Sequence, residues 1–339
     1  MLKQKYDNIN LLKFIATICV ILIHVVSGDL YKYSTISNSD WNIANAINSI
    51  SRICVPVFLM VSGALLLSKD ESIEDFFKKR FLRIIPKFLL FSTFYYLIDV
   101  YYLHHQVHNF IVSLLQGEVF YHLWYVYMIL GIYLLVPFLR KIIHNIEDKY
   151  VWYFLIVWFF FMSLIPFIEF VTKLNLKIYN PLGQYIGYFI LGYYLLNTRK
   201  IKQIPLIVFN LVFALLTVVL SYYYTKKSGK LVDYFYNYHS ITIFFQSITI
   251  YLIVIGTNLT KFLEKATKLD KIIKEGSRLS FDIYLIHPII LLLLEQNIKL
   301  RMNYSFYIII SFTITVITSY IIAKSIEFLL NKRRKKLWL

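Results

Sequence analysis

Two basic side chains share one face of the first apolar segment. Lys13 and His24 are eleven residues apart, so at about 100° per residue they differ by only about 20° around a helix. About 16 Å separates them along the axis, which predicts Lys13 near the inner boundary of a membrane and His24 beyond its midplane. A titratable group buried at that depth is a functional candidate. The pair is equally explained if Lys13 reaches the headgroups and His24 bonds a neighbouring helix.

Two arginines follow in the first long polar connection. Arg80 and Arg83 are three residues apart and therefore neighbours on one face of a helix. Each guanidinium offers planar, paired donors that stay charged, so the two side by side make a good clamp for phosphate. A solvated basic face that binds lipid phosphates is the alternative interpretation.

A phenol and an imidazole lie three residues apart in a late apolar segment. Tyr284 and His287 share one helical face near its middle, where they can orient a substrate or each other. Pro288 follows directly and permits a kink, so a purely structural role is the alternative.

Aromatic residues flank another histidine at the outer edge of the fourth predicted span. His122, Trp124 and Tyr125 occur in "YHLWYVY", and aromatic rings beside polar donors suit the stacking of a sugar ring. The aromatic belt of a membrane protein produces Trp and Tyr at this depth without any function.

The elements that hold these residues are predicted to be membrane helices. Hydrophobic residues make up 58% of the 339-residue chain, the mean hydropathy is +0.61, and apolar stretches long enough to cross a core of about 30 Å recur throughout. We predict an all-α polytopic fold, one membrane domain over residues 1–339. About ten helices are predicted, near 9–27, 50–67, 84–103, 120–139, 151–170, 181–197, 205–223, 240–258, 279–296 and 305–328.

Charge sets the predicted orientation. Of the 36 Lys and Arg residues, 24 fall in the segments that lie inside if the N-terminus is cytoplasmic, which is the positive-inside pattern. Both termini are therefore expected in the cytoplasm. The net charge of +17 is interpreted as topological, with no nucleic acid as partner. Between the second and third spans, the stretch "IEDFFKKRFLRIIPKF" at 73–88 predicts an amphipathic helix that lies on the inner surface before Pro86 starts the third span.

Cysteine usage and the N-terminus exclude some classes of protein. Cys19 and Cys54 both lie inside predicted helices, where we expect them to pack as small apolar residues with no disulfide and no metal site. The first apolar segment contains Lys13 and His24 and has no small-residue cleavage pattern after it, so it is interpreted as a mature helix rather than a signal peptide.

Together these residues resemble the acyltransferase-3 family, integral membrane enzymes that move acyl groups from acyl-CoA to exported glycans. The family's basic residue, ten positions and histidine resemble Lys13–His24, and its Arg-x-x-Arg resembles Arg80–Arg83. Further family-like segments are "VPVFLMVSGALL" at 55–66, "HLWY" at 122–125 and "YLIHP" at 284–288. Lys13 stands where many relatives have Arg. The resemblance is to the stand-alone form, without an extracytoplasmic esterase-like domain.

The resemblance implies a mechanism. Arg80 and Arg83 would hold the phosphates of acetyl-CoA or another acyl-CoA, with Lys13 at the mouth of a corridor that leads the thioester to His24. His24 would act as general base or be transiently acylated. Tyr284, His287 and His122 are expected to position groups or stabilise an oxyanion, and His122, Trp124 and Tyr125 to bind the acceptor.

Other functions stay open at this stage. Buried Lys and His also fit a polysaccharide exporter or proton-coupled transporter, although no matched pair of broken helices supports one. A third interpretation is the membrane module of a sensor or uptake protein. Expected partners are acyl-CoA, a glycan acceptor and membrane lipids, in a bacterial plasma membrane. The acceptor glycan, the choice of acetyl or succinyl, and the oligomeric state are left undecided by the sequence.

Overall fold

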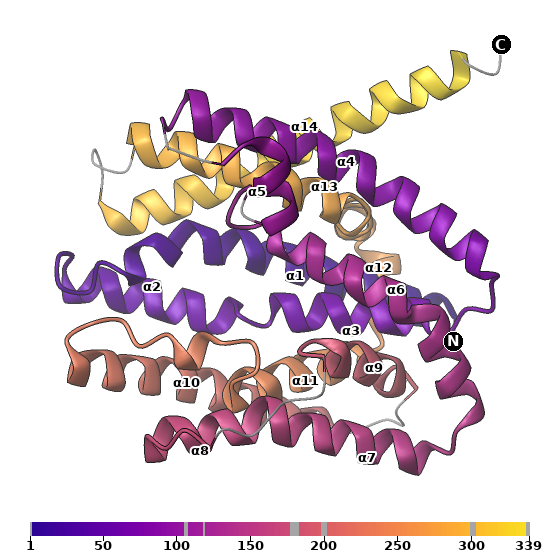
Figure 1. Cartoon of the computed structure of the whole chain (residues 1–339), viewed down its shortest axis with the longest axis horizontal. Helices are drawn as coiled ribbons and strands as arrows, with labels where there is room; N and C mark the ends of the chain where they lie inside the picture. Colours follow the sequence, from indigo (N-terminus) through magenta and orange to yellow (C-terminus); the bar gives the residue numbers. More distant parts are fainter. Residues whose placement is uncertain are drawn as a thin grey trace. The chain divides into compact units, whose positions relative to one another are not determined.

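A computed structural model describes residues 2–104, 108–117, 119–176, 183–197, 202–298 and 303–336 of the chain (Figure 1). The chain divides into two compact units, which are described separately. Unit 1 comprises Met1–Ala64 and Tyr153–Leu339, and unit 2 comprises Leu65–Trp152. Within the described residues all regular structure is helical, which confirms the predicted all-α class.

The helices follow one another along the chain with short connections. Their bounds are α1 Leu2–Leu30, α2 Asn38–Ser51, α3 Cys54–Leu66, α4 Ile73–Tyr101, α5 Phe110–Gln116, α6 Trp124–Asn145, α7 Asp148–Phe159, the π-helical turn η1 Phe160–Leu164, α8 Ile165–Thr172, α9 Ile186–Leu195, α10 Gln203–Ser228, the 3₁₀ turn η2 Tyr234–Tyr236, α11 Ile241–Gly256, α12 Leu259–Lys265, α13 Thr267–Ile298 and α14 Tyr304–Lys336.

Many of these helices are long enough to span a membrane. In the described ranges, nine helical segments are long and apolar enough to cross a bilayer. The segment predicted over 181–197 is represented by α9, which has ten residues, and its first two predicted residues lie outside the described ranges. At about 1.5 Å per residue α9 covers only about 15 Å, so it is shorter than the predicted span.

Unit 1 is organised around α1. This helix packs against α2 and α13, and α14 packs against α13 (Figure 1). A second pair, α10 and α11, contacts α2 and α1. Leu12, Ala16 and Val26 of α1 are fully buried, as an inner helix of a membrane bundle requires.

Two glycines let α9 approach α3 at backbone distance. A Cβ atom on Gly63 would lie 1.7 Å from the backbone oxygen of Phe189, and one on Gly192 would lie 2.0 Å from that of Met60. Small residues at such crossings allow close packing between membrane helices, where the hydrophobic effect contributes little. The contact fixes the short helix α9 within unit 1.

The sequence prediction has no helix between the first two spans, over residues 28–49. The structure contradicts this in the second half of that stretch. Residues 38–51 form α2, which Ser37 caps by accepting a hydrogen bond from the backbone N–H of Asp40. Only the two residues Arg52 and Ile53 separate α2 from α3, so Asn38–Leu66 serves as one broken span. Asn and Ser residues lower the apolarity of α2, and burial of those side chains between helices, rather than exposure to water, accounts for the difference.

The separate amphipathic helix predicted before Pro86 is also wrong. The basic segment forms the first turns of α4, which continues through Pro86 to Tyr101. One proline removes only one main-chain hydrogen bond, and long membrane helices accommodate this loss. Ser72 caps α4 by accepting a hydrogen bond from the backbone N–H of Asp75. In unit 2, α4 packs against α5 and α6.

Candidate active site

Two histidines from distant parts of the sequence meet inside unit 1. The imidazole of His24 on α1 lies with its centroid 5.1 Å from that of His287 on α13, at an angle of 37° between the rings. His287 is fully buried and His24 is partly buried. The close packing of α1 on α13 positions both rings. The structure therefore joins two of the three residues predicted to be catalytic.

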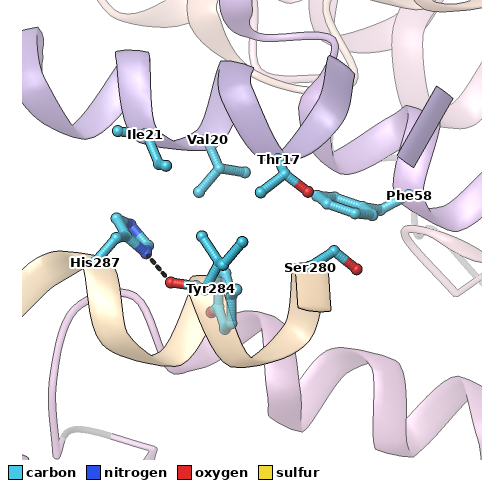
Figure 2. Close-up of a pocket in the computed structure, with 8 residues that line it drawn as sticks. Thr17, Val20, Ile21, Phe58, Ser280, Tyr284 and His287 are labelled. Carbon is cyan, nitrogen blue, oxygen red and sulfur yellow. Dashed lines mark hydrogen bonds between the residues drawn. The ribbon is translucent and has the colours of Figure 1, made fainter. Parts of the chain in front are cut away.

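A main-chain hydrogen bond fixes the orientation of His287. Its Nδ1 lies 3.2 Å from the carbonyl oxygen of Ile283 (Figure 2). A carbonyl oxygen only accepts, so Nδ1 carries the proton and the lone pair resides on Nε2. The ring of Tyr284 lies 6.0 Å from that of His287, centroid to centroid. Tyr284 thus lies beside His287, one turn earlier on α13.

A narrow crevice runs between α1 and α13 beside these residues. Tyr284 and His287 line it together with Thr17, Val20 and Phe58, among others (Figure 2). In this conformation it is too narrow to hold a water molecule. Lys13 and His24 do not line this crevice, and the predicted corridor joining them stays a prediction.

Lys13 lies on α1, eleven residues before His24. It is partly buried, and its carbonyl oxygen accepts a hydrogen bond from the Thr17 hydroxyl at 2.8 Å. Polar contacts hold the same end of α1 to other helices: Asn8 donates to the carbonyl oxygens of Ile255 and Thr257. A cation on this end of α1 is therefore part of a fixed polar region.

An arginine that the sequence did not single out lies at the break between α2 and α3. The guanidinium carbon of Arg52 is 5.6 Å from the ring centroid of Tyr236 and 5.5 Å from that of Tyr238. Arg52 ends α2, which packs against α1, the helix that carries His24. Arg52 thus adds a positive charge to the pair of helices that holds the candidate base.

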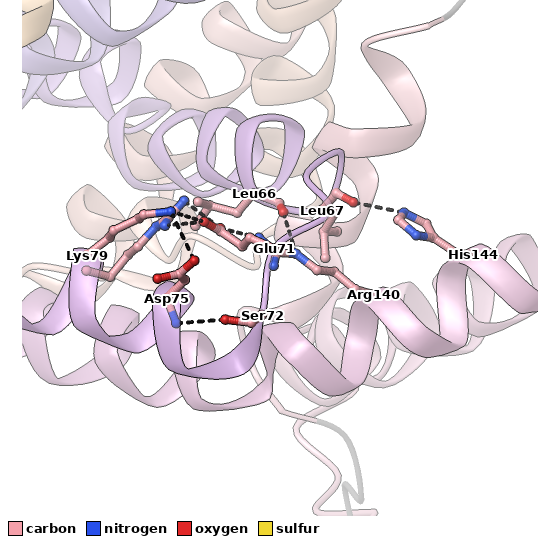
Figure 3. A network of polar contacts seen from close by, with 9 residues as sticks. Leu66, Leu67, Glu71, Ser72, Asp75, Lys79, Arg140 and His144 are labelled. Atoms are coloured by element: carbon pink, nitrogen blue, oxygen red, sulfur yellow. Dashed lines mark hydrogen bonds and ion pairs between the residues drawn. The ribbon is translucent and has the colours of Figure 1, made fainter.

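In unit 2, Glu71 binds two arginines at once. Its carboxylate oxygens lie 2.8 and 2.9 Å from the Arg80 guanidinium and 2.9 Å from Nη2 of Arg140 (Figure 3). The Nε of Arg140 donates to the carbonyl oxygen of Leu66 at 2.8 Å. Both guanidinium groups also lie 4.9 Å from the ring centroid of Phe76. This cluster, Glu71–Arg80–Arg140, joins the start of α4 to α6.

The electrostatics of the cluster fix Glu71 as a carboxylate. Burial by itself would raise the pKa of Glu71, but the hydrogen bonds and charges of Arg140 and Arg80 outweigh it and lower the pKa to about 2. Arg80 therefore has a permanent anionic partner. Arg83, one turn further along α4, is exposed. The two residues of the predicted phosphate clamp thus have different environments: Arg80 is in an ion cluster and Arg83 faces outward.

His122 lies within an aromatic enclosure in unit 2. It is 1% exposed, and its ring centroid is 4.8 Å from that of Tyr95 and 5.7 Å from that of Phe120. Trp124 and Tyr125 are partly buried and meet edge to face at 6.3 Å. Of the three residues predicted to bind the acceptor, these two offer accessible ring surface.

The comparison with known families covers most of both units. The profile of the acyltransferase-3 family, described as an acyltransferase domain, matches residues 6–324. The chain belongs to the acyltransferase-3 family. No curated protein and no solved structure matches it.

The match confirms the resemblance drawn from the motifs, and with the apolar helices it makes the chain a multi-pass membrane acyltransferase. The free, buried Cys19 and Cys54 agree with the predicted packing role. In the described residues of the acyltransferase, no group of three or more His, Cys, Asp or Glu side chains has metal-binding geometry.

Sequence reasoning missed several polar residues of this acyltransferase. The predicted span 50–67 has Arg52 close to its outer end, because the prediction includes no helix over 38–49, where the structure has α2. Glu71 and Arg140 are 69 residues apart in the sequence, and no local pattern pairs them. The sequence signal that could have identified Arg52 and Arg140 is a charged residue inside or next to an apolar segment.

Proposed function

We propose that this acyltransferase moves an acyl group, acetyl in the first instance, from cytoplasmic acyl-CoA to a sugar hydroxyl. The acceptor is a cell-surface or exported polysaccharide or its lipid-linked precursor, and the membrane is a bacterial plasma membrane. The observation that carries the proposal is the contact of His24 with His287 in a chain of the acyltransferase-3 family. A buried pair of imidazoles supplies proton-transfer groups where sugar hydroxyls need activation.

The chemistry assigned to His24 is general-base catalysis. A neutral imidazole has a reference pKa near 6.5 and accepts a proton at neutral pH. As His24 takes the hydroxyl proton, the sugar oxygen forms a bond to the thioester carbon and the carbon–sulfur bond breaks. CoA leaves as a thiolate, which receives the proton from His24. In the alternative two-step route, His24 carries the acyl group as an acyl-imidazole before the sugar attacks.

His287 and Tyr284 are assigned to positioning. The hydrogen bond from Nδ1 of His287 to Ile283 holds the ring with its Nε2 lone pair in a fixed direction. A hydrogen bond to one ring nitrogen of a histidine fixes the tautomer and the orientation of the ring. Tyr284 packs against His287 and borders the crevice.

The donor phosphates are assigned to Lys13, Arg80 and Arg83. Arg83 offers a complete guanidinium fork because it is exposed, and Arg80 contributes the N–H groups that remain beside Glu71. Arginine binds phosphate through two parallel hydrogen bonds, whereas lysine acts as a point charge. The acceptor is assigned to His122, Trp124 and Tyr125, with the two accessible rings stacking on the sugar.

Mass spectrometry of surface glycans tests the proposal in cells. Cells that carry the gene should show O-acyl groups that are missing after its deletion, and the mass increment identifies the acyl group. Complementation with His24→Ala should not restore them, whereas His108→Ala should, because His108 is exposed. Unchanged glycan acylation after deletion would contradict the proposal, as would full restoration by a stably expressed His24→Ala protein.

A further inference from the structure

Arg52 lies halfway along a membrane span. It is fourteen residues from each end of Asn38–Leu66 and forms the C-cap of α2, with its backbone N–H bonded to the carbonyl oxygen of Asn48. Arginine stays charged in proteins, and a charge at the centre of a bilayer is costly unless another group compensates it. The position therefore calls for an anionic or strongly polar partner.

The described part of the chain gives Arg52 only aromatic and phenolic partners. The guanidinium lies over the rings of Tyr236 and Tyr238 and is hydrogen-bonded to the Tyr238 hydroxyl. No carboxylate among the described residues forms an ion pair with it, and its Nε is buried there without a hydrogen-bond acceptor. These aromatic rings and the hydroxyl attract the guanidinium and hold it in place, but they supply no negative charge to balance it.

Asn48 lies one turn before Arg52 on the same face of α2. Its side chain is fully buried, and within the described ranges neither its amide nitrogen nor its amide oxygen has a hydrogen-bond partner. Buried amides are nearly always bonded, since an unmet donor or acceptor costs free energy. An N–H donor of Asn48 and an N–H donor of Arg52 are thus available side by side.

We propose that Arg52 and Asn48 form a binding site for an oxygen anion carried by the acyl group. The inference rests on the proposed function and assigns a role to two residues outside the family motifs described above. Arg52 ends α2, and α2 packs against α1, so the site lies against the helix that carries the candidate base. Guanidinium and amide N–H groups are the donors that stabilise oxyanions in acyl transfer.

The anion has two chemical sources. As the sugar oxygen attacks, the carbonyl electron pair of the thioester moves to its oxygen, and this oxyanion returns the pair when the carbon–sulfur bond breaks. Donors from Arg52 and Asn48 stabilise that charge in the transition state. The second source is the carboxylate at the far end of a dicarboxylic acyl group, which is negatively charged throughout the reaction. In that case Arg52 selects which acyl-CoA the enzyme uses.

Steady-state transfer with two donors distinguishes these sources. The full-length protein in nanodiscs is given acetyl-CoA or succinyl-CoA with the glycan acceptor, for wild type, Arg52→Gln, Arg52→Lys and Asn48→Leu. Arg278→Gln is the matched control, because Arg278 forms ion pairs with Glu275 and Glu327 at an exposed position of α13. A thioester oxyanion predicts that Arg52→Gln lowers kcat about a hundredfold for both donors with KM little changed.

Loss confined to succinyl-CoA, mainly through KM, assigns the site to a terminal carboxylate and also supports the proposal. Arg52→Lys should be intermediate because it keeps the charge but loses the planar fork. Asn48→Leu should lower transfer while raising thermal stability, because it removes the unmet amide groups; a purely structural role predicts no loss of transfer. Unchanged kcat and KM for Arg52→Gln with both donors would overturn the proposal.

A binding measurement separates failure of this inference from failure of the proposed function. If wild type transfers neither acyl group, thermal unfolding is measured with acetate and with succinate. Stabilisation of wild type and of Arg278→Gln, lost in Arg52→Gln, shows the oxygen-anion site without the transfer reaction. Equal melting temperatures of wild type and Arg52→Gln at every anion concentration would overturn the site itself.

Discussion

At the scale of residues, the molecule places its candidate chemistry on side chains that are far apart in the sequence. His24 and His287 meet through the packing of α1 on α13. The hydrogen bond at Nδ1 gives His287 one defined tautomer. Arg52 adds a positive charge at the end of α2, which packs against α1.

Replacing His287 should slow the reaction without weakening donor binding. We expect His287→Ala to lower kcat about tenfold to a hundredfold, because it removes the ring that packs against His24, and to leave KM for acyl-CoA close to wild type. The measurement is steady-state transfer with melting temperature recorded in parallel. An increase in KM alone would show that His287 belongs to donor binding instead.

At the scale of elements, two contacts decide how the helices are held. The backbone crossing of α3 and α9 depends on Gly63 and Gly192, and the start of α4 depends on the cluster Glu71–Arg80–Arg140. The first contact is steric and the second is electrostatic. Substitution and pH therefore test them separately.

The glycine crossing predicts a steric effect of a single methyl group. Gly192→Ala should lower the melting temperature strongly, because the new Cβ would lie 2.0 Å from the backbone oxygen of Met60. Gly28→Ala in α1 is the matched control, since nothing lies within 4 Å of its Cβ position, and it should be neutral or stabilising by about 0.4–1 kcal/mol. Equal melting temperatures of the two variants would contradict the crossing.

The ion cluster predicts a pH dependence of stability. The pKa of Glu71 is about 2 when folded, below its reference value near 4.3. A lowered folded pKa gives stability that is complete above the unfolded pKa and is lost as the pH falls from about 4.3 toward 2. Wild type should lose thermal stability through this window more steeply than Glu71→Gln, which has no carboxyl to protonate.

At neutral pH the same Glu71→Gln variant should be less stable than wild type by about 3 kcal/mol, because it leaves two mostly buried arginines without an anion. Melting temperatures in nanodiscs between pH 7 and 3 provide both results. Parallel pH profiles for wild type and Glu71→Gln would show that the cluster contributes nothing to stability.

At the scale of the whole molecule, the topology depends on α9. Nine described segments are long enough to cross the membrane, and an odd number of crossings would place the termini on opposite sides. The positive-inside pattern predicts both termini inside, so we predict that the segment containing α9 completes a tenth crossing.

Cysteine labelling tests this topology. Lys5→Cys and Lys336→Cys should both be protected from a membrane-impermeant maleimide in intact cells and labelled after lysis. The native Cys19 and Cys54 are buried and give little background. Labelling of Lys336→Cys, but not Lys5→Cys, in intact cells would mean that α9 does not complete a crossing.

Apolar length predicted the class of fold and most spans, because a helix must satisfy its own main chain in lipid. It failed at α2, whose Asn and Ser residues face other helices, and at α4, which continues through Pro86. Residue spacing singled out His24, Tyr284 and His287 as candidates, and the structure brings the rings of His24 and His287 together. Spacing could not find Arg52 or the pairing of Glu71 with Arg140, because tertiary contacts between distant segments create those environments.

The most direct test of the central claim is release of CoA from acetyl-CoA by the purified protein in nanodiscs, measured with and without a glycan acceptor. Wild type and His108→Ala should release CoA only when the glycan is present. His24→Ala, folded with an unchanged melting temperature, should be slower by at least about a hundredfold. Glycan-dependent release at the wild-type rate by His24→Ala would contradict the account.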